Sequence, residues 1–242
     1  MSLLDVFPND LIGVLGTSYT QSNTVLPGPT NPAIYPWFYD ARQTLNAKYA
    51  VDSLDGSGTK VKGITSYRRA PRWIRGGVIG QNFAGFNAAG YFFSKVGQYN
   101  PNCVIVEAGE NDIGSGTFLA DATTLAGIVK NPANYAAGIV TARWIAWVSC
   151  MWRGTEAWSP APDANIVAAN NNIKTVCTAQ GFTYIDAFSL WLAEAPSTNP
   201  GNATNGFYNW DGTHPTGPNG PHGDLGCDVM GRATIATMKL HF

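Results

Sequence analysis

Three short segments, far apart in the chain, together carry the residue types that can hydrolyse an ester through a serine nucleophile. They are GTSY at residues 16–19, GEND at residues 109–112 and DGTH at residues 211–214. Ser18 offers a hydroxyl nucleophile, and the Asn111 amide can donate a hydrogen bond to the negatively charged oxygen of a tetrahedral intermediate. The third segment places an acid beside a base. Each segment is common by chance, so the prediction depends on their order and their positions in the fold.

The DGTH segment supplies the pair for proton transfer. Asp211 and His214 are three residues apart, so on a single helical turn their side chains would lie on one face and could touch. The carboxylate would orient one imidazole nitrogen and leave the other to accept the Ser18 proton. The two other histidines fit this role less well. His222 has no carboxylate three residues before it, and His241 is next to the C-terminus.

The apolar pattern predicts a single α/β domain over residues 1–242. Short apolar runs alternate with longer helical patterns, which is typical of parallel strands joined by helical crossovers. The expected strands are residues 11–15, 77–82, 103–108, 144–151 and 182–186. The expected helices are residues 34–47, 88–99, 132–142, 163–180 (with Asp163 as the cap and Gly181 as the stop) and 225–240. We therefore expect one layered α/β sandwich with about five parallel strands.

The first two segments follow expected strands. Ser18 comes after the apolar run LIGVLG, and Asn111 comes after CVIVEA. In open parallel sheets ligands bind beyond the carboxyl ends of the strands, so we expect both side chains at the same sheet edge. Gly16 would permit the tight turn that exposes Ser18. We expect Asp112 to cap the turn that follows it rather than to take part in the chemistry.

Two regions interrupt the alternation of strands and helices. Residues 51–76 contain Gly, Ser and six basic side chains, and we expect them to form an insertion before the second strand. Residues 195–223 are rich in Asn, Gly, Pro and Thr and lack an apolar period. Long loops in compact domains are usually functional, so this one, which carries DGTH, is predicted to be an active-site loop.

Composition narrows the classes of function. Charged residues make up 13% of the chain and the net charge is −1, which argues against the broad basic surface that binds nucleic acid or an anionic membrane. Abundant Asn, Thr, Ser and Gly favour a secreted or particle-borne protein. The N-terminus lacks the pattern of a secretory signal, and no stretch reaches the roughly 18 apolar residues of a membrane span. Cys103, Cys150 and Cys177 lie in apolar segments and are expected to be buried free thiols.

The three segments together resemble the SGNH hydrolase superfamily, also called GDSL-type esterases and lipases. Ser18, Asn111, Asp211 and His214 match its motifs in order and in position along nearly the whole chain. The resemblance implies a flavodoxin-like three-layer α/β/α sandwich and hydrolysis of acyl esters without a cofactor or a metal. It further implies that the backbone N–H of Ser18 is an oxyanion donor beside the Asn111 amide.

The resemblance also implies a family glycine after the second strand, whose backbone N–H is another oxyanion donor. This glycine falls within GQNFAGFNAAG, where Gly85 fits best and Gly80 and Gly90 are alternatives. The chain departs from the family at Thr17, where the family usually has Asp. Because the nucleophile itself is unchanged, we expect this difference to cost little activity.

Two other classes of hydrolase fit the residues less well. An α/β-hydrolase requires a GxSxG turn after a central strand, and GTSYT lacks the second glycine. A metal hydrolase could use Asp211, His214, His222 and Asp224, but their spacing matches no established set of ligands.

A third alternative is a non-catalytic module that binds carbohydrate or mediates attachment. Aromatic side chains can stack on sugars, and Trp158, Trp191 and Trp210 are the best candidates for surface platforms. Trp144, Trp147 and Trp152 lie in or beside an expected strand and are assigned to the core. An intact set of nucleophile, base and oxyanion donor favours an enzyme over this alternative.

The substrate is less well defined than the reaction. Low charge, polar loops with aromatic residues and the absence of an amphipathic lid favour a small acyl group, such as acetyl, on a carbohydrate. A short-chain lipase or arylesterase and a thioesterase are the alternatives, because these enzymes would use the same catalytic residues.

Overall fold

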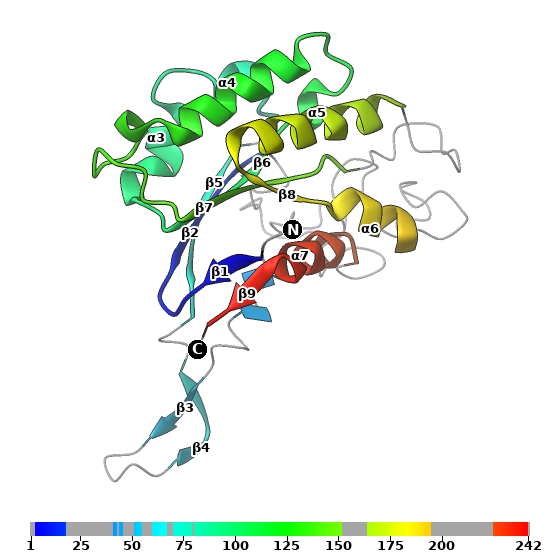
Figure 1. Ribbon diagram of the computed structural model, residues 1–242. Coiled ribbons are helices and arrows are strands. Elements are labelled where there is room, and N and C mark those ends of the chain that lie inside the picture. Colours follow the sequence, from blue (N-terminus) through cyan, green and yellow to red (C-terminus); the bar gives the residue numbers. More distant parts are fainter. Residues whose placement is uncertain are drawn as a thin grey trace, which may run out of the picture.

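The computed structural model describes residues 3–17, 41–42, 44–45, 51–54, 60–66, 70–78, 80–151, 164–194 and 225–241. Figure 1 shows a layered molecule, with a central sheet between two sets of helices. Both chain ends lie on the same side of the sheet, next to the short strands β1 (Leu4–Val6) and β9 (Met238–Leu240). Within the described residues, no helix is long and apolar enough to span a membrane.

The central sheet has five strands in the order β5-β2-β6-β7-β8, and every neighbouring pair is parallel. The strands are β5 (Arg72–Gly77), β2 (Leu11–Gly16), β6 (Cys103–Glu107), β7 (Trp144–Val148) and β8 (Thr183–Ile185). Every residue of β6 is buried, as expected for a central strand covered on both faces. The predicted three-layer α/β sandwich with five parallel strands is confirmed.

Helices cover both faces of this sheet (Figure 1). One face carries α2 (Phe83–Phe86), α3 (Tyr91–Lys95), α4 (Phe118–Lys130) and α5 (Ala164–Gln180). The other carries α6 (Ala187–Glu194) and α7 (Leu225–Ala236). The core accordingly divides into two clusters. Trp147 and Phe83 belong to the first, and Trp191 and Met230 belong to the second.

Trp191 therefore corrects one expectation. It was a candidate for a surface platform, but its side chain is fully buried in α6. Trp147 is also fully buried, as expected, and its indole N–H donates to the carbonyl oxygen of Ala108 at 3.1 Å. The other two surface candidates, Trp158 and Trp210, lie outside the described residues.

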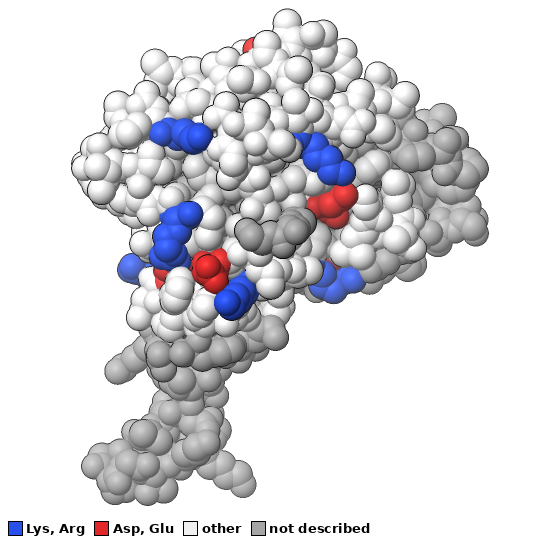
Figure 2. Space-filling model, viewed as in Figure 1, with Lys and Arg blue, Asp and Glu red and all other residues white. Residues whose placement is uncertain are grey.

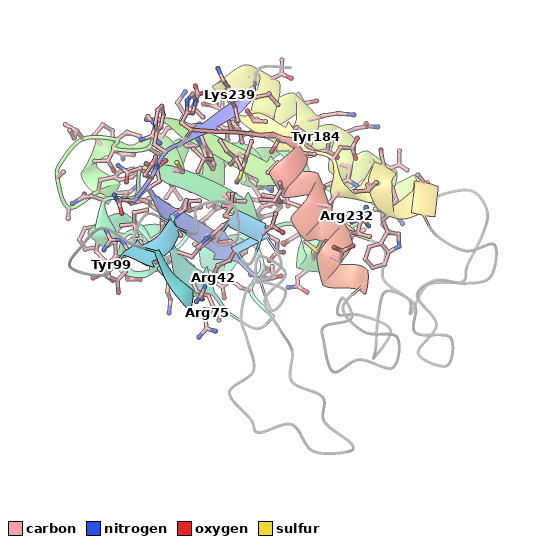
Figure 3. All side chains as sticks on the ribbon, turned by 90° about the horizontal axis from the view of Figure 1, so that it is seen from below. Arg42, Arg75, Tyr99, Tyr184, Arg232 and Lys239 are labelled. Carbon is pink, nitrogen blue, oxygen red and sulfur yellow. The ribbon has the colours of Figure 1, made fainter. Side chains whose placement is uncertain are left out.

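Several predicted elements differ from those observed. The strand expected at 77–82 is β5, five residues earlier in the chain. It is a sheet edge, where Arg72 and Arg75 can reach solvent, so an apolar run was not required. Figure 3 shows Arg75 projecting outward from this edge. Of the helix expected at 132–142, only the 3₁₀ turn Pro132–Asn134 forms, and the backbone is already extended at Tyr135.

Helix α4 was missed, although its apolar period is present in the sequence. Four of its buried residues, Phe118, Ala122, Leu125 and Val129, are spaced three or four apart, and Ala126 is buried beside them. Helix α5 matches its predicted range, and Gly181, with a φ of 74°, ends it as expected. The last predicted helix ends at Ala236, and the residues after it form strand β9.

The region 51–76 contains two strands outside the central sheet and most of strand β5. Strands β3 (Val51–Leu54) and β4 (Lys60–Ser66) form an antiparallel pair, which is a separate two-stranded sheet. The last residues of the region belong instead to β5 of the central sheet. Elsewhere on the face seen in Figure 2, charged side chains are few and scattered, in keeping with the low charge of the chain.

The two ends of the chain are held together at β1 and β9, which pair in parallel. Beyond them His241 Nε2 lies 2.7 Å from the Asp5 carboxylate, and the His241 ring stacks on Phe7 at 4.4 Å between centroids. The hydrogen bond to His241 is the main reason that the pKa of Asp5 is lowered. His241 thus has a structural partner of its own, near the residues that precede β2.

Candidate active site

Three strands bring their carboxyl ends together at one edge of the sheet. Gly16, the last residue of β2, pairs with Gly77 at the end of β5 on one side and with Glu107 at the end of β6 on the other. This parallel register places Thr17, the residue directly after β2, between the ends of β5 and β6. It is the kind of edge at which parallel sheets bind ligands.

The structure describes part of the predicted site. Thr17, Gly85 and Asn111 are described, whereas Ser18 and the pair Asp211 and His214 lie outside the described residues. The alternative set of metal ligands also lies outside them. The geometry that follows therefore concerns the surroundings of the nucleophile and the oxyanion donors.

Thr17 is anchored to the neighbouring strand by two hydrogen bonds. Its backbone N–H donates to Glu107 Oε2 and its hydroxyl donates to Glu107 Oε1, both at 2.9 Å. Thr17 is fully buried and Glu107 is 2% exposed. A buried carboxylate is costly unless hydrogen bonds compensate for lost hydration, so this contact is a firm attachment. Sequence reasoning missed Glu107, although a carboxylate that ends the apolar run CVIVE was the signal for it.

Asn111 attaches the turn after β6 to the turn after β5. It lies in the 3₁₀ helix η2 (Glu110–Asp112) and its side chain is exposed. Its Nδ2 donates to the carbonyl oxygen of Gln81 at 2.8 Å. The amide is therefore oriented by the protein and remains accessible from solvent, which is the arrangement required of a preorganised donor.

Asp112 connects the turn after β6 to helix α2. Its carboxylate accepts a hydrogen bond from the backbone N–H of Phe83 at 3.0 Å, at the start of α2. A carboxylate at a helix N-terminus satisfies an amide that has no partner within the helix. Asn111 and Asp112 thus hold successive parts of the segment 80–83.

The other two residues of GEND are also constrained. Gly109 has a φ of 118°, and a side chain there would place its Cβ 2.8 Å from the ring of Phe118. Glu110, which is 3% exposed, accepts a hydrogen bond from the backbone N–H of Met151 beyond β7. The GEND segment follows β6 and forms hydrogen bonds to residues after β5 and β7. These contacts fix the backbone on both sides of Asn111.

The glycines of the second motif can now be compared. Gly85 lies inside α2, and its backbone N–H donates to the side chain of Asn82, the N-cap residue, at 3.1 Å. Gly80 lies in the turn directly after β5 with a φ of 69°, next to the Gln81 carbonyl that Asn111 binds. Gly90 caps the later helix α3. This geometry favours Gly80, one of the two alternatives, over Gly85 as a donor beside Asn111.

Two of the described cysteines are unsuited to act as competing nucleophiles. Cys103, Cys150 and Cys177 are buried free thiols, as expected. Burial raises the pKa of Cys177 to about 12. Burial, reinforced by the nearby Asp10 carboxylate, also raises the pKa of Cys103. Because the thiolate is the reactive form, Cys103 and Cys177 remain protonated and unreactive near neutral pH.

A comparison with models of protein families identifies the family of this chain. The model of the GDSL-like lipase/acylhydrolase family matches residues 14–218, a span that contains all three motifs. No curated protein sequence matches the chain.

Solved structures share the fold at low sequence identity. An acetylxylan esterase from Geobacillus stearothermophilus is 14% identical with a TM-score of 0.62, over 98% of this chain and 96% of that chain. An alpha/beta hydrolase enzyme from the metagenome of Lake Arreo, Spain, is 14% identical with a TM-score of 0.63, over 96% of each chain. A lipase/acylhydrolase from Enterococcus faecalis is 14% identical with a TM-score of 0.59, over 94% of each chain.

Proposed function

Because the chain belongs to the GDSL-like lipase/acylhydrolase family, we propose that it is a serine esterase that cleaves short acyl esters, with Ser18 as the nucleophile. The observation that best supports this is the exposed Asn111 amide, held by Gln81 at the sheet edge where the chain passes from Thr17 to Ser18. An oriented donor beside a serine is the arrangement that acyl transfer requires.

The reaction proceeds in two steps. Ser18 Oγ attacks the ester carbonyl carbon while His214 accepts the hydroxyl proton, and Asp211 holds the imidazole in the productive tautomer. The tetrahedral intermediate collapses to an acyl-enzyme as His214 protonates the departing alcohol. Water then attacks the acyl carbon with His214 again as the base, which releases the carboxylic acid and regenerates Ser18.

The negative charge on the substrate oxygen is stabilised by three N–H groups. They belong to the Asn111 side chain and to the backbones of Ser18 and a glycine. We assign the glycine to Gly80, since the Gly85 amide already donates to Asn82. Gly80 precedes Gln81, whose carbonyl oxygen accepts a hydrogen bond from Asn111, so the glycine and asparagine donors are in adjacent segments.

The substrate we propose is an acetyl or similarly short acyl ester on a carbohydrate. The acetylxylan esterase from Geobacillus stearothermophilus shares the fold over nearly its whole length, and two of its structures are catalytic mutants in which a serine and an aspartate are replaced by alanine. These residue types match Ser18 and Asp211. The low charge of this chain suits a neutral polymer rather than an anionic one.

Rates on substrates of two kinds test this assignment. We expect p-nitrophenyl acetate to be cleaved faster than esters of longer acids, and acetate to be released from acetylated xylan. A rate that peaks at long acyl chains, with no acetate released from any acetylated glycan, would identify a lipase instead. Failure of a fluorophosphonate to label Ser18 in folded protein would indicate the non-catalytic binding module.

The contribution of Asn111 can be measured separately. Asn111→Ala should lower kcat about 10²- to 10³-fold, which is the usual effect of removing one oxyanion donor, and should change KM little. Asn134→Ala is a matched control, because the Asn134 amide also donates to a backbone carbonyl, that of Ile128 at 2.9 Å, but in the turn after α4. Equal kcat values for the two variants would remove Asn111 from the oxyanion site.

A further inference from the structure

The two hydrogen bonds between Thr17 and Glu107 constrain the residue immediately before the nucleophile. One bond holds the backbone N–H of Thr17 and the other holds its hydroxyl, each at 2.9 Å and each on a different oxygen of the same carboxylate. A single bond would allow the residue to pivot about it. Two bonds, to the main chain and to the side chain, restrict the peptide plane and χ1 of Thr17 together.

The carboxylate is itself well anchored. Glu107 ends β6, a central strand whose residues are all buried, and pairs in register with Gly16, the neighbour of Thr17. Thr17 has no exposed surface, so water does not compete for these bonds. Hydrogen bonds to a buried charged acceptor are about twice as strong as those between neutral groups.

We propose that Glu107 is a positioning residue for Ser18, acting through the two hydrogen bonds that it accepts from Thr17. The inference rests on the proposed function, in which Ser18 is the nucleophile. Its physical basis is that catalysis requires the attacking oxygen to be held in a narrow range of positions. A displacement of about 1 Å can cost about 10²-fold in rate.

This arrangement also explains why a donor side chain is required at position 17. Glu107 presents two acceptor oxygens, and Thr17 supplies two donors. An aspartate at position 17 would place a second carboxylate against Glu107 in a buried site. Two carboxylates at such a distance cannot both remain ionised without strong repulsion. Thr17 is thus matched to Glu107, which gives a physical reason for the expectation that Thr in place of the family's Asp costs little activity.

Two pairs of variants test the proposal, with kcat and KM measured on p-nitrophenyl acetate and folding checked by thermal unfolding. Thr17→Ser keeps both donors and should retain kcat within about twofold, whereas the isosteric Thr17→Val loses the hydroxyl and should lower kcat about 10- to 100-fold with little change in KM. Thr17→Asp should be impaired further. Adding Glu107→Gln to it should restore kcat at least tenfold, because the glutamine amide can donate to Asp and its carbonyl can accept the backbone N–H.

The outcomes separate this inference from the proposed function. If the wild-type protein neither hydrolyses esters nor reacts with a fluorophosphonate, the proposed function fails. If the wild-type protein is active but folded Thr17→Val and Thr17→Asp keep its kcat, the positioning role alone is overturned. Should both variants fail to fold, Glu107→Gln decides, because its amide has the shape of the carboxylate. We expect its kcat to fall about three- to tenfold with KM unchanged, and wild-type kcat would overturn the proposal.

Discussion

Ser18→Ala should lower kcat for ester hydrolysis by at least about 10⁴-fold and leave the thermal unfolding midpoint close to that of the wild type. The alanine lacks the oxygen that attacks the carbonyl carbon, so no acyl-enzyme can form. The substitution removes one oxygen atom and leaves the Thr17–Glu107 contact in place, so folding should not depend on it.

The matched control is Ser94→Ala. Ser94 is an exposed serine of α3, and its hydroxyl donates to the Tyr91 carbonyl at 2.8 Å. We expect it to retain wild-type kcat. Labelling by a fluorophosphonate should be lost only in Ser18→Ala. Substantial ester turnover by Ser18→Ala, on a sample free of contaminating esterase, would show that the nucleophile has been assigned wrongly.

His214→Ala should reduce kcat nearly as much as Ser18→Ala, again by at least about 10⁴-fold, because members of a catalytic triad act as a unit. Without the imidazole, no group in the proposed triad accepts the Ser18 proton or protonates the departing alcohol. His241→Ala is the control. His241 is already bound to Asp5 and stacked on Phe7, so its replacement should affect the pairing of the chain ends and leave kcat unchanged.

Replacing Asp211 should also lower kcat, but by less than replacing His214. Its loss alone leaves both the nucleophile and the base in place, and in a well-studied triad the aspartate alone contributes about 10²-fold less than the serine or the histidine. Asp211→Ala should therefore keep measurable activity. If it retains wild-type kcat, another group orients His214.

The central fold was largely predictable because its signals are local. The runs that became β2 and β6 are continuous and apolar, as fully buried parallel strands are, and α5 carries a helical period that ends at Gly181. Strand β5 was misplaced because an edge strand need bury only part of its surface, so that RWIRGG has no such run. The position of β5 was decided by its pairing with β2, which the local sequence does not show.

The proposed glycine donor also could not be identified from local sequence alone. Spacing alone allowed Gly80, Gly85 and Gly90, since each follows the second strand. The choice depends on what each amide contacts. The Gly85 N–H is used by Asn82 within α2, and Gly80 lies in the turn beside Gln81 and Asn111. Because that turn begins where β5 ends, the position of the strand boundary decides which glycine is the better candidate for the donor.

The sequence by itself determined the family and the candidate residues of the site, since residue type and order along the chain are enough to identify Ser18, Asn111, Asp211 and His214 as candidates. Only the tertiary structure showed what Asn111 contacts, and what holds Thr17, the residue before Ser18. Glu107 is 90 positions from Thr17 along the chain and meets it because β2 and β6 are neighbours in register. Asn111 likewise meets Gln81 across the ends of β6 and β5, 30 positions apart. A local pattern can single out a residue such as Glu107, but which residue it meets depends on strand order and register, and these are properties of the whole sheet.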